Sequence, residues 1–312
     1  MNEQPIMKMT NGDTYQGEVQ DEKPHGYGVH KLASGDVYEG HFNMGQRHGQ
    51  GKMTKKDGST HEGDWNNNLP HGQGSQHLSN GDVYVGGFHQ GRRHGFGKMT
   101  KTDGSSYEGQ WEMSVRQGQG KYLMSNGDLY EGEFRDGLSH GQGNMTMKDG
   151  STYVGRWFQG LPHGEGMQTL SMGHVYEGEF REGKRSGFGK RTMRDGSTYE
   201  GNWLNDVLEG QAKACLANGE VYEGDFVEDK RHGYGKVKMA NGSTYEGLWD
   251  EGLPHGHGKM ALTTNGEIYE GEFVKGKRYG KGKLIMSTSQ GMSFNSQGQH
   301  YEGEFKENLP NG

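Results

Sequence analysis

The sequence lacks the material for a thick hydrophobic core. Only 28% of its 312 residues are hydrophobic, and the mean hydropathy is −1.07. No apolar run is long enough to cross a bilayer, so we expect no membrane-spanning segment and no signal peptide. Such a composition is close to that of disordered chains. It excludes a large two-layer core, but it allows a thin sheet whose stability accumulates from neighbour to neighbour.

Cysteine and basic charge are also scarce. The single Cys215 excludes an internal disulfide and suits a reducing compartment, and its strand-like position predicts a packing role. The formal net charge of −7 leaves no basic excess to neutralise phosphates. We therefore expect no nucleic-acid partner.

Catalytic and metal-binding patterns are missing from the sequence. It contains no P-loop, no Gly-x-Ser-x-Gly and no His-Glu-x-x-His. Half of its 16 histidines occupy one position of a repeat, and on adjacent hairpins they would lie about 10 Å apart. Zinc needs all its ligands about 2.1 Å from one centre. We predict no metal site, no cofactor and no enzymatic activity.

Glycine and tyrosine, in contrast, are abundant and regularly spaced. Starting at Tyr15, a tyrosine (once a histidine, His61) returns at ten successive intervals of 23 residues. The next intervals are 24 residues, to Tyr269, and 32 residues, to Tyr301. Each tyrosine stands two residues before a glycine and, in most copies, four before an aromatic residue. A fixed period predicts a repeat architecture, which builds a long surface rather than one catalytic pocket.

Each 23-residue unit predicts a β-hairpin. Asn-Gly or Asp-Gly precedes most tyrosines at a constant offset, as in Asp57-Gly58, and indicates a type I′ turn. A two-residue turn would place Leu32 opposite Val37, on the face away from the tyrosines. The glycines of His-Gly-x-Gly, as in His48–Gly51, predict the second reversal of the chain.

A period of 46 residues is superposed on the first. The aromatic residue alternates between phenylalanine and tryptophan, as at Phe42 and Trp65. Before His-Gly, most odd repeats carry proline, such as Pro70, and most even repeats carry arginine, such as Arg47. Better interdigitation of alternating rings accounts for part of this pattern. It leaves the basic residues unexplained.

The pattern Tyr-Glu-Gly-x-Phe/Trp with His-Gly-x-Gly resembles the MORN repeat (membrane occupation and recognition nexus). Tyr130–Phe134 with His140–Gly143 is a clear copy, and the resemblance covers essentially the whole chain. The sequence departs from this pattern at scattered positions, including His61, Gln117 and Ala212. The resemblance implies a single-layer twisted sheet with a groove. It also implies kinship with radial-spoke and other ciliary proteins and with cytoskeletal scaffolds.

We therefore predict an all-β fold, a single-layer antiparallel β-sheet solenoid of about 13 MORN hairpin repeats. The period is 23 residues and the super-repeat 46 residues. Residues 1–312 are expected to form one array without a helix longer than two turns. A loop of about residues 286–298 is expected to protrude.

Three surfaces are candidate binding sites. The tyrosine rings are predicted to line a groove for a helix or extended segment of a partner protein, because exposed apolar stripes mark binding sites. These are Tyr38, Tyr84, Tyr107, Tyr130, Tyr153, Tyr176, Tyr199, Tyr222 and Tyr245. The even-repeat loops are predicted to form a basic stripe for an acidic protein surface. It comprises Arg47, Arg92, Arg93, Lys184, Arg185, Lys230, Arg231, Lys277 and Arg278.

The third surface is the last strand, from Tyr301 to Phe305. Its edge is predicted to pair with another chain, either a second copy end to end or a partner strand. Pro310 would limit how far that pairing extends.

These features favour a non-enzymatic scaffold of a cytoskeletal assembly, with the ciliary or flagellar axoneme (a radial spoke or another axonemal complex) as the expected place in the cytoplasm. The alternative is a peripheral membrane adaptor whose basic loops meet anionic phospholipid. The net negative charge and the absence of a hydrophobic anchor weigh against this alternative.

Overall fold

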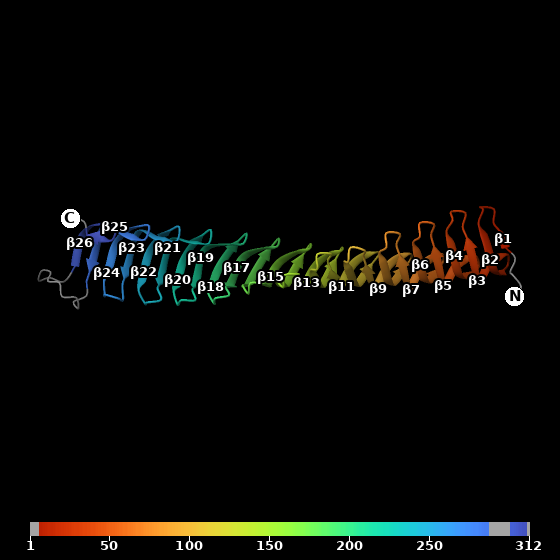
Figure 1. Ribbon diagram of the computed structural model, residues 1–312, viewed down its shortest axis with the longest axis horizontal. Helices are drawn as coiled ribbons and strands as arrows, with labels where there is room; N and C mark the ends of the chain where they lie inside the picture. Colours follow the sequence, from red (N-terminus) through yellow and green to blue (C-terminus); the bar gives the residue numbers. More distant parts are fainter. Residues whose placement is uncertain (1–5, 287–299, 311–312) are drawn as a thin grey trace. The chain divides into compact units, whose positions relative to one another are not determined.

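The computed structural model describes residues 6–286 and 300–310, and every regular element in these ranges is a β-strand. The strands belong to one antiparallel sheet, which confirms the predicted fold class (Figure 1). Strands pair with their sequence neighbours, as β4 does with β3 and β5. The strands are β1 (Ile6–Lys8), β2 (Thr14–Gln20), β3 (Lys23–Lys31), β4 (Val37–Asn43), β5 (Gln46–Thr54), β6 (Thr60–Asn66), β7 (Leu69–His77), β8 (Val83–His89), β9 (Arg92–Thr100), β10 (Ser106–Glu112), β11 (Val115–Leu123), β12 (Leu129–Arg135), β13 (Leu138–Thr146), β14 (Thr152–Phe158), β15 (Leu161–Thr169), β16 (Val175–Arg181), β17 (Lys184–Thr192), β18 (Thr198–Leu204), β19 (Val207–Cys215), β20 (Val221–Val227), β21 (Lys230–Lys238), β22 (Thr244–Asp250), β23 (Leu253–Ala261), β24 (Ile268–Val274), β25 (Lys277–Ile285), β26 (His300–Lys306) and β27 (Leu309–Pro310).

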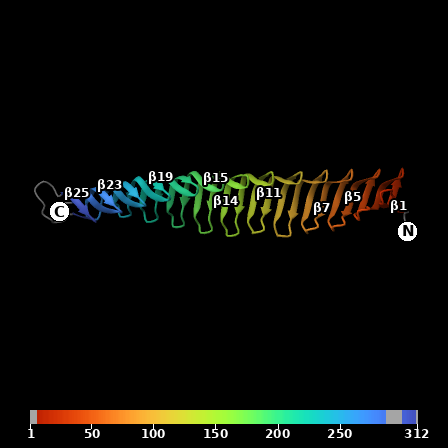
Figure 2. The ribbon, with the colours of Figure 1, turned by 90° about the horizontal axis from the view of Figure 1, so that it is seen from above.

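By its internal contacts the chain divides into two units. One comprises Met1–Gly150 with Arg156–Leu161, and the other comprises Ser151–Gly155 with Pro162–Gly312. Within each unit, consecutive strands lie side by side (Figure 2). The expected loop of about residues 286–298 falls, apart from Met286, outside the described residues. That residues 1–312 act as a single array stays a prediction.

The turn before each tyrosine differs from the prediction. Before Tyr38, for example, Gly35 N donates to Leu32 O at 2.9 Å and Leu32 N donates to Asp36 O at 2.9 Å. This is a type I turn closed by a left-handed glycine, because Gly35 has a φ of 95° and Ser34 does not have a positive φ. The predicted type I′ turn is therefore wrong, and the hairpin has a three-residue loop.

The longer loop shifts the register by one residue. Lys31, not Leu32, lies opposite Val37, and Leu32 lies opposite Asp36. The aliphatic stripe predicted on the face away from the tyrosines is therefore wrong. Asn and Asp still have a role here, because their side chains accept a backbone N–H two residues later, as Asp57 Oδ1 does from Ser59 N at 2.8 Å.

The second reversal also lies elsewhere than predicted. Met44 and Gly45 both have positive φ, 47° and 88°, and Asn43 pairs with Gln46 across them. The two-residue type I′ turn therefore occurs here, several residues before His-Gly-x-Gly. The latter motif lies inside β5, where Gly49 has a φ of 67° and the ladder contains a bulge.

The bulge explains why tyrosine is required. Between the pairs Gly40–Gly51 and Phe42–Arg47 the register shifts, and the carbonyl of His41 is left to accept the Tyr38 hydroxyl at 3.1 Å. The phenol lies across the facing glycines, since a Cβ on Gly51 would collide with its hydroxyl oxygen. The same bond recurs at Tyr84, Tyr130 and other tyrosines, with the hydroxyl donating three residues downstream. These further copies are Tyr15, Tyr107, Tyr176, Tyr222, Tyr245, Tyr269 and Tyr301.

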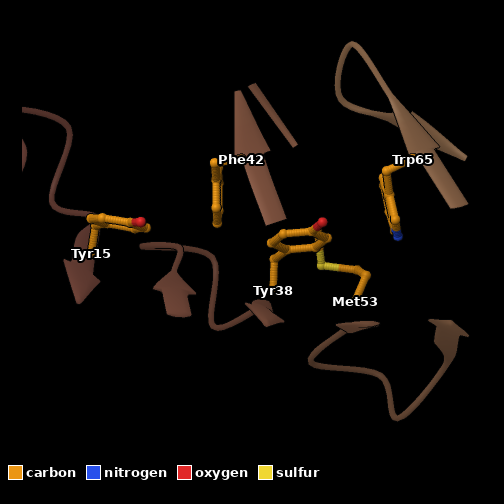
Figure 3. Packing of buried hydrophobic residues seen from close by; sticks show 5 residues of the cluster. All are labelled: Tyr15, Tyr38, Phe42, Met53 and Trp65. Atoms are coloured by element: carbon orange, nitrogen blue, oxygen red, sulfur yellow. The ribbon is translucent and has the colours of Figure 1, made fainter. Parts of the chain in front are cut away.

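The rings form a ladder along one face of the sheet, which we call the aromatic face. Tyr38 lies edge-on to Phe42 of its own repeat and to Trp65 of the next, both with ring centroids at 5.1 Å (Figure 3). Tyr15 meets Phe42 in the same way at 5.2 Å (Figure 3). Such edge-to-face contacts each contribute about 0.5–1.5 kcal/mol beyond area burial. They link each repeat to the next, as a thin sheet requires.

One departure from the repeat shows what the glycine does. Ala212 stands where other repeats have the second glycine of the pair, and its Cβ occupies the slot opposite Gly201. Tyr199 of this repeat is only half-buried, and it makes no ring contact or hydrogen bond within the described part of the chain. The buried Leu208 and Ala214 occupy this region instead. An added methyl group thus excludes the tyrosine from the ladder.

We predict that Gly51→Ala will expel Tyr38 in the same manner. The free energy of unfolding should fall by about 2 kcal/mol or more, because the added methyl collides with a buried ring. The pKa of Tyr38, which burial raises to about 12, should fall towards that of an exposed phenol. Urea denaturation and ultraviolet phenol titration would measure both effects.

The control for this prediction is Gly58→Ala, where a Cβ would meet nothing within 4 Å. That variant should cost only the left-handed backbone strain, about 1–2 kcal/mol, and should leave the Tyr38 titration unchanged. A Gly51→Ala protein with an unaltered Tyr38 titration would contradict the prediction.

Candidate functional site

The predicted groove tyrosines lie inside the aromatic face rather than on its surface. Eight of the nine are at most 3% exposed, with Tyr107 and Tyr176 at that upper limit. The exception is the displaced Tyr199. Burial raises the pKa of most of them to about 12, so the phenols remain protonated and act as hydrogen-bond donors. Their rings are not available as a partner surface in this structure, and partner capture at these positions stays a prediction.

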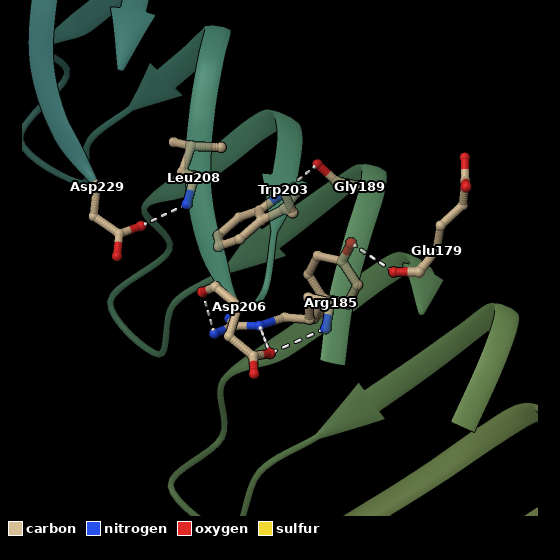
Figure 4. A network of polar contacts seen from close by, with 8 residues as sticks. Glu179, Arg185, Gly189, Trp203, Asp206, Leu208 and Asp229 are labelled. Carbon is tan, nitrogen blue, oxygen red and sulfur yellow. Dashed lines mark hydrogen bonds and ion pairs between the residues drawn. The ribbon is translucent and has the colours of Figure 1, made fainter. Parts of the chain in front are cut away.

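Arginines cover the rings, which explains the 46-residue period. The Arg47 guanidinium lies 5.7 Å from the Tyr38 ring centroid and 5.1 Å from that of Trp65 in the next repeat. Arg185 lies over Tyr176 and Trp203 in the same way, and it is bonded to Asp206 (Figure 4). Arg93 and Arg231 repeat the arrangement. The arginine of an even repeat thus stacks on the tryptophan of the following odd repeat.

Tryptophan completes the two-repeat unit. The Trp65 indole N–H donates to Gly51 O at 2.9 Å, and Pro70 lies directly opposite Trp65 in the ladder. The Trp203 indole donates likewise to Gly189 O (Figure 4). Phenylalanine lacks this donor and lies opposite arginine instead, as the pair Phe42–Arg47 shows. The alternation of phenylalanine with tryptophan and that of arginine with proline therefore arise from the same packing.

The predicted basic stripe consists of two kinds of residue. The second member of each pair stacks on the rings and is largely buried, as Arg278 is at 10% side-chain exposure. The first member is exposed, as Lys230 and Lys277 are at 52% and 54%. The exposed members are Arg92, Lys184, Lys230 and Lys277. Of the nine predicted stripe residues, these four are the most exposed.

The opposite face, which we call the charged face, carries a ladder of exposed ion pairs. Lys52 bonds Glu62 at 3.2 Å and Lys121 bonds Glu131 at 2.8 Å, and similar pairs recur along the chain. Exposed ion pairs of this kind contribute little to stability. They keep this face hydrated.

A cavity of about 420 Å³ opens on the aromatic face of the first unit. Its lining includes Arg93, Trp111, Arg116 and Tyr122, together with hydroxyl groups such as that of Ser105. Sequence reasoning missed Arg116, although the signal was present. Arginine stands there in an odd repeat, where proline is the rule.

Among the described residues, no group of three His, Cys, Asp or Glu is arranged to hold a metal ion. His71, His89 and His94 do lie near one another, with ring centroids 5.1 Å and 5.5 Å apart in succession. Cys215 is a partly buried free thiol at the end of β19. No helical segment of the described residues is long and apolar enough to span a membrane.

The last strand follows the pattern of the others. Phe305 is 2% exposed and lies 4.9 Å from Tyr269 and 5.2 Å from Tyr301, measured between ring centroids. On its far side, β26 pairs with β27 only at Phe305–Pro310 and Lys306–Leu309. The predicted pairing of this edge with another chain stays a prediction.

His61 is the weak point of the ladder. It replaces tyrosine, is 6% exposed, and lies edge-on to Trp65 at 5.1 Å and to Phe88 at 4.6 Å. Within the described chain neither ring nitrogen has a hydrogen-bond partner. Burial lowers the pKa of His61 to about 4. The carbonyl of Asp64, which a tyrosine hydroxyl would reach, receives no such bond.

We predict that His61→Tyr will raise the free energy of unfolding by about 1 kcal/mol at neutral pH, since it adds one hydrogen bond and removes two unpaired nitrogens. The gain should grow at pH 5. Because the folded-state pKa lies below the ordinary value of about 6.5, the unfolded chain takes up the proton first as the pH falls. The stability that the neutral histidine provides is full above pH 6.5 and is lost towards pH 4.

Urea denaturation at pH 7.5 and pH 5 would measure the difference between the two proteins. His48→Tyr, at an exposed histidine, should show no widening of that difference. A gain for His61→Tyr that is equal at both pH values would refute the proposed cost of the buried imidazole.

No curated protein matches the sequence significantly. The TCP10 domain of Danio rerio CPAP in complex with a peptide of Danio rerio STIL matches at 10% identity over 71% of this chain and 93% of that chain, with a TM-score of 0.38. The TCP domain of Drosophila melanogaster SAS-4, in complex with a proline-rich motif of Ana2, matches at 12% identity over 57% and 90%, with a TM-score of 0.32. At these scores neither likeness bears on function.

The family comparison covers nearly the whole chain. The MORN repeat model matches 13 times, at residues 15–37, 38–60, 61–83, 84–106, 107–129, 130–152, 153–175, 176–198, 199–221, 222–244, 245–266, 269–289 and 301–312. The matched repeats coincide with the tyrosine-bearing hairpins described above. The chain therefore belongs to the MORN repeat family, whose repeats are typical of non-enzymatic scaffold and binding proteins.

Proposed function

We propose that this MORN-repeat protein is a non-enzymatic scaffold of a cytoskeletal assembly, and that the assembly is the ciliary or flagellar axoneme, as a radial spoke or another axonemal complex. The 13 repeats would act there as one array that binds protein partners. The observation that carries the proposal is that, within each repeat, some positions serve packing and others are exposed. Tyrosine, glycine and the second aromatic residue all serve packing, and the exposed positions recur at constant intervals.

Recurrent exposed positions suit a partner that is itself extended. Arg92, Lys184, Lys230 and Lys277 all stand at the first position of their strands, and each is exposed. Exposed apolar side chains occupy the same position in other repeats, as Leu69 and Leu253 do at 47% each. A partner that contacts this edge would meet basic and apolar side chains in turn, which supports an acidic, amphipathic protein surface as the target.

The alternative, a peripheral membrane adaptor, rests on the same four exposed cations. Anionic lipid attracts exposed Lys and Arg with about 1 kcal/mol for each residue. The formal net charge of −7 opposes such attraction. We therefore favour the protein partner.

We predict that reversing the four exposed charges (Arg92→Glu, Lys184→Glu, Lys230→Glu, Lys277→Glu) will release the protein from axonemes. In ciliated cells that express tagged chains, retention of the wild type after detergent extraction at 0.15 M salt would be compared with that of the variant. Exposed substitutions should change the free energy of unfolding by no more than about 0.5 kcal/mol each. A loss of retention would then reflect lost contacts.

The matched control reverses four lysines of the charged face (Lys98, Lys121, Lys190 and Lys213) and so changes the net charge equally. This protein should remain on the axoneme. Equal release of both variants would attribute the effect to net charge and contradict the edge as a binding surface. A wild-type protein that is extracted entirely would contradict the scaffold, and its flotation with phosphatidylserine vesicles would favour the adaptor.

A further inference from the structure

The regular alternation of proline and arginine fails in the middle of the first unit. Even repeats carry arginine opposite the phenylalanine, as at Arg93, and odd repeats carry proline opposite the tryptophan, as at Pro70. In the fifth repeat Arg116 lies opposite Trp111, and in the sixth Ser139 lies opposite Phe134. The arginine expected in the sixth repeat is thus found in the fifth. Two consecutive repeats therefore present a guanidinium on the same face, about 10 Å apart by strand spacing.

These two arginines border the cavity of about 420 Å³. Arg93 lies over Trp111 at 5.4 Å from the ring centroid, and Arg116 lies over Tyr122 at 4.5 Å. The rings hold both guanidinium planes in place. Leu78 lies in the apolar part of the lining and Lys101 adds a third cation.

The two arginines of this cavity lack the bonded carboxylate that Arg185, Arg231 and Arg278 have. Arg231 is bonded to Glu220, and Arg278 to Glu267 at 3.1 Å. Within the described ranges neither Arg93 nor Arg116 has an ion pair, and the Arg116 guanidinium donates only to Gly137 O, at 2.6 Å.

The one carboxylate in the lining is already engaged. Asp82 accepts from Thr102 N at 3.1 Å with one oxygen and from the Asn80 side chain at 3.0 Å with the other. It therefore leaves the two guanidinium groups with free donors. Asp82 attracts the partly buried Arg93 electrostatically, but within the described ranges no carboxylate is bonded to either guanidinium, so both keep donors for a further anion.

We propose that this cavity is a specificity pocket for an acidic segment of a partner protein. An Asp or Glu carboxylate of the segment enters between Arg93 and Arg116, and a neighbouring apolar side chain contacts Trp111 and Leu78. The proposal rests on the proposed function in one respect, that the chain binds protein segments on its surface. It adds where one of them binds and what chemistry selects it.

A protein segment fits this cavity better than a lipid headgroup does. A phosphate group would pair with the arginines but would leave the apolar lining, which includes Leu78, Met99 and Val115, without a contact. A peptide supplies both a carboxylate and an apolar side chain within a few residues. The net negative charge of the chain, −7, also disfavours an anionic bilayer.

The test uses the full chain and a phage-displayed library of random 12-residue peptides. Peptides selected on the wild type should be enriched in Asp or Glu next to Leu, Phe or Trp. The decisive variant is Arg116→Pro with Ser139→Arg, which restores the alternation and keeps the net charge. Proline is tolerated at this position of the repeat, since Pro70 and Pro254 lie opposite Trp65 and Trp249 as Arg116 does opposite Trp111.

The affinity of a selected peptide, measured by fluorescence anisotropy, should fall at least tenfold in that double variant. The matched control is Arg47→Gln, which removes an equally ring-stacked arginine from a repeat whose successor carries proline. It should change the affinity by less than twofold. Arg93→Gln provides a second variant if the double variant does not fold, as judged by circular dichroism.

Selected peptides without acidic residues, or peptides that bind the double variant as tightly as the wild type, would overturn the proposal. Binding of the wild type to phosphatidylserine vesicles with loss in the double variant would overturn it in favour of lipid. If the wild-type protein is not retained on axonemes but still selects acidic peptides, the proposed function is wrong and the pocket stands. If the protein is retained but selects no acidic peptides, the pocket is wrong and the proposed function stands.

Discussion

The structure depends on one repeated hydrogen bond, from a buried tyrosine hydroxyl to a carbonyl that a bulge has freed. The bond requires three things at once. The chain must bulge after the first glycine so that the carbonyl is available, as at His41. Both facing residues must be glycine so that the ring lies across them, as Gly40 and Gly51 do. The ring must carry a hydroxyl. The tyrosine and glycines of the Tyr-x-Gly and Gly-x-Gly motifs meet these three requirements.

The two exceptions in the chain separate these requirements. Ala212 keeps the hydroxyl but fills the slot, and Tyr199 is displaced from the ladder. His61 keeps the slot but lacks the hydroxyl, and its ring stays in the ladder with both nitrogens unpaired. Space therefore decides whether the ring enters the stack, and the hydroxyl decides whether the buried polar atoms are satisfied. Because each repeat contacts only its neighbours, both defects remain local.

The packing device also sets what is left for binding. Arginines of the even repeats are largely consumed in covering Tyr and Trp rings, as Arg47 and Arg185 show. Only four of the nine predicted cations are therefore exposed, because alternate residues of a strand point to opposite faces. The alternation of proline and arginine fails at Arg116 and Ser139, and there the ring-stacked arginines border a cavity.

The sequence by itself determined the repeat, its period, the antiparallel hairpins and the family, because glycine, tyrosine and ring spacing are local constraints that survive without knowledge of the rest. It misplaced the two turn types, since Asn-Gly and Asp-Gly occur both in type I′ turns and beside a left-handed glycine in longer loops. The one-residue shift that follows moved Leu32 to the opposite face. Only the tertiary structure decided which side chains are accessible. Tyr130 looks like a groove residue in sequence and is fully buried, because it packs against Phe134 of its own repeat and Trp157 of the next.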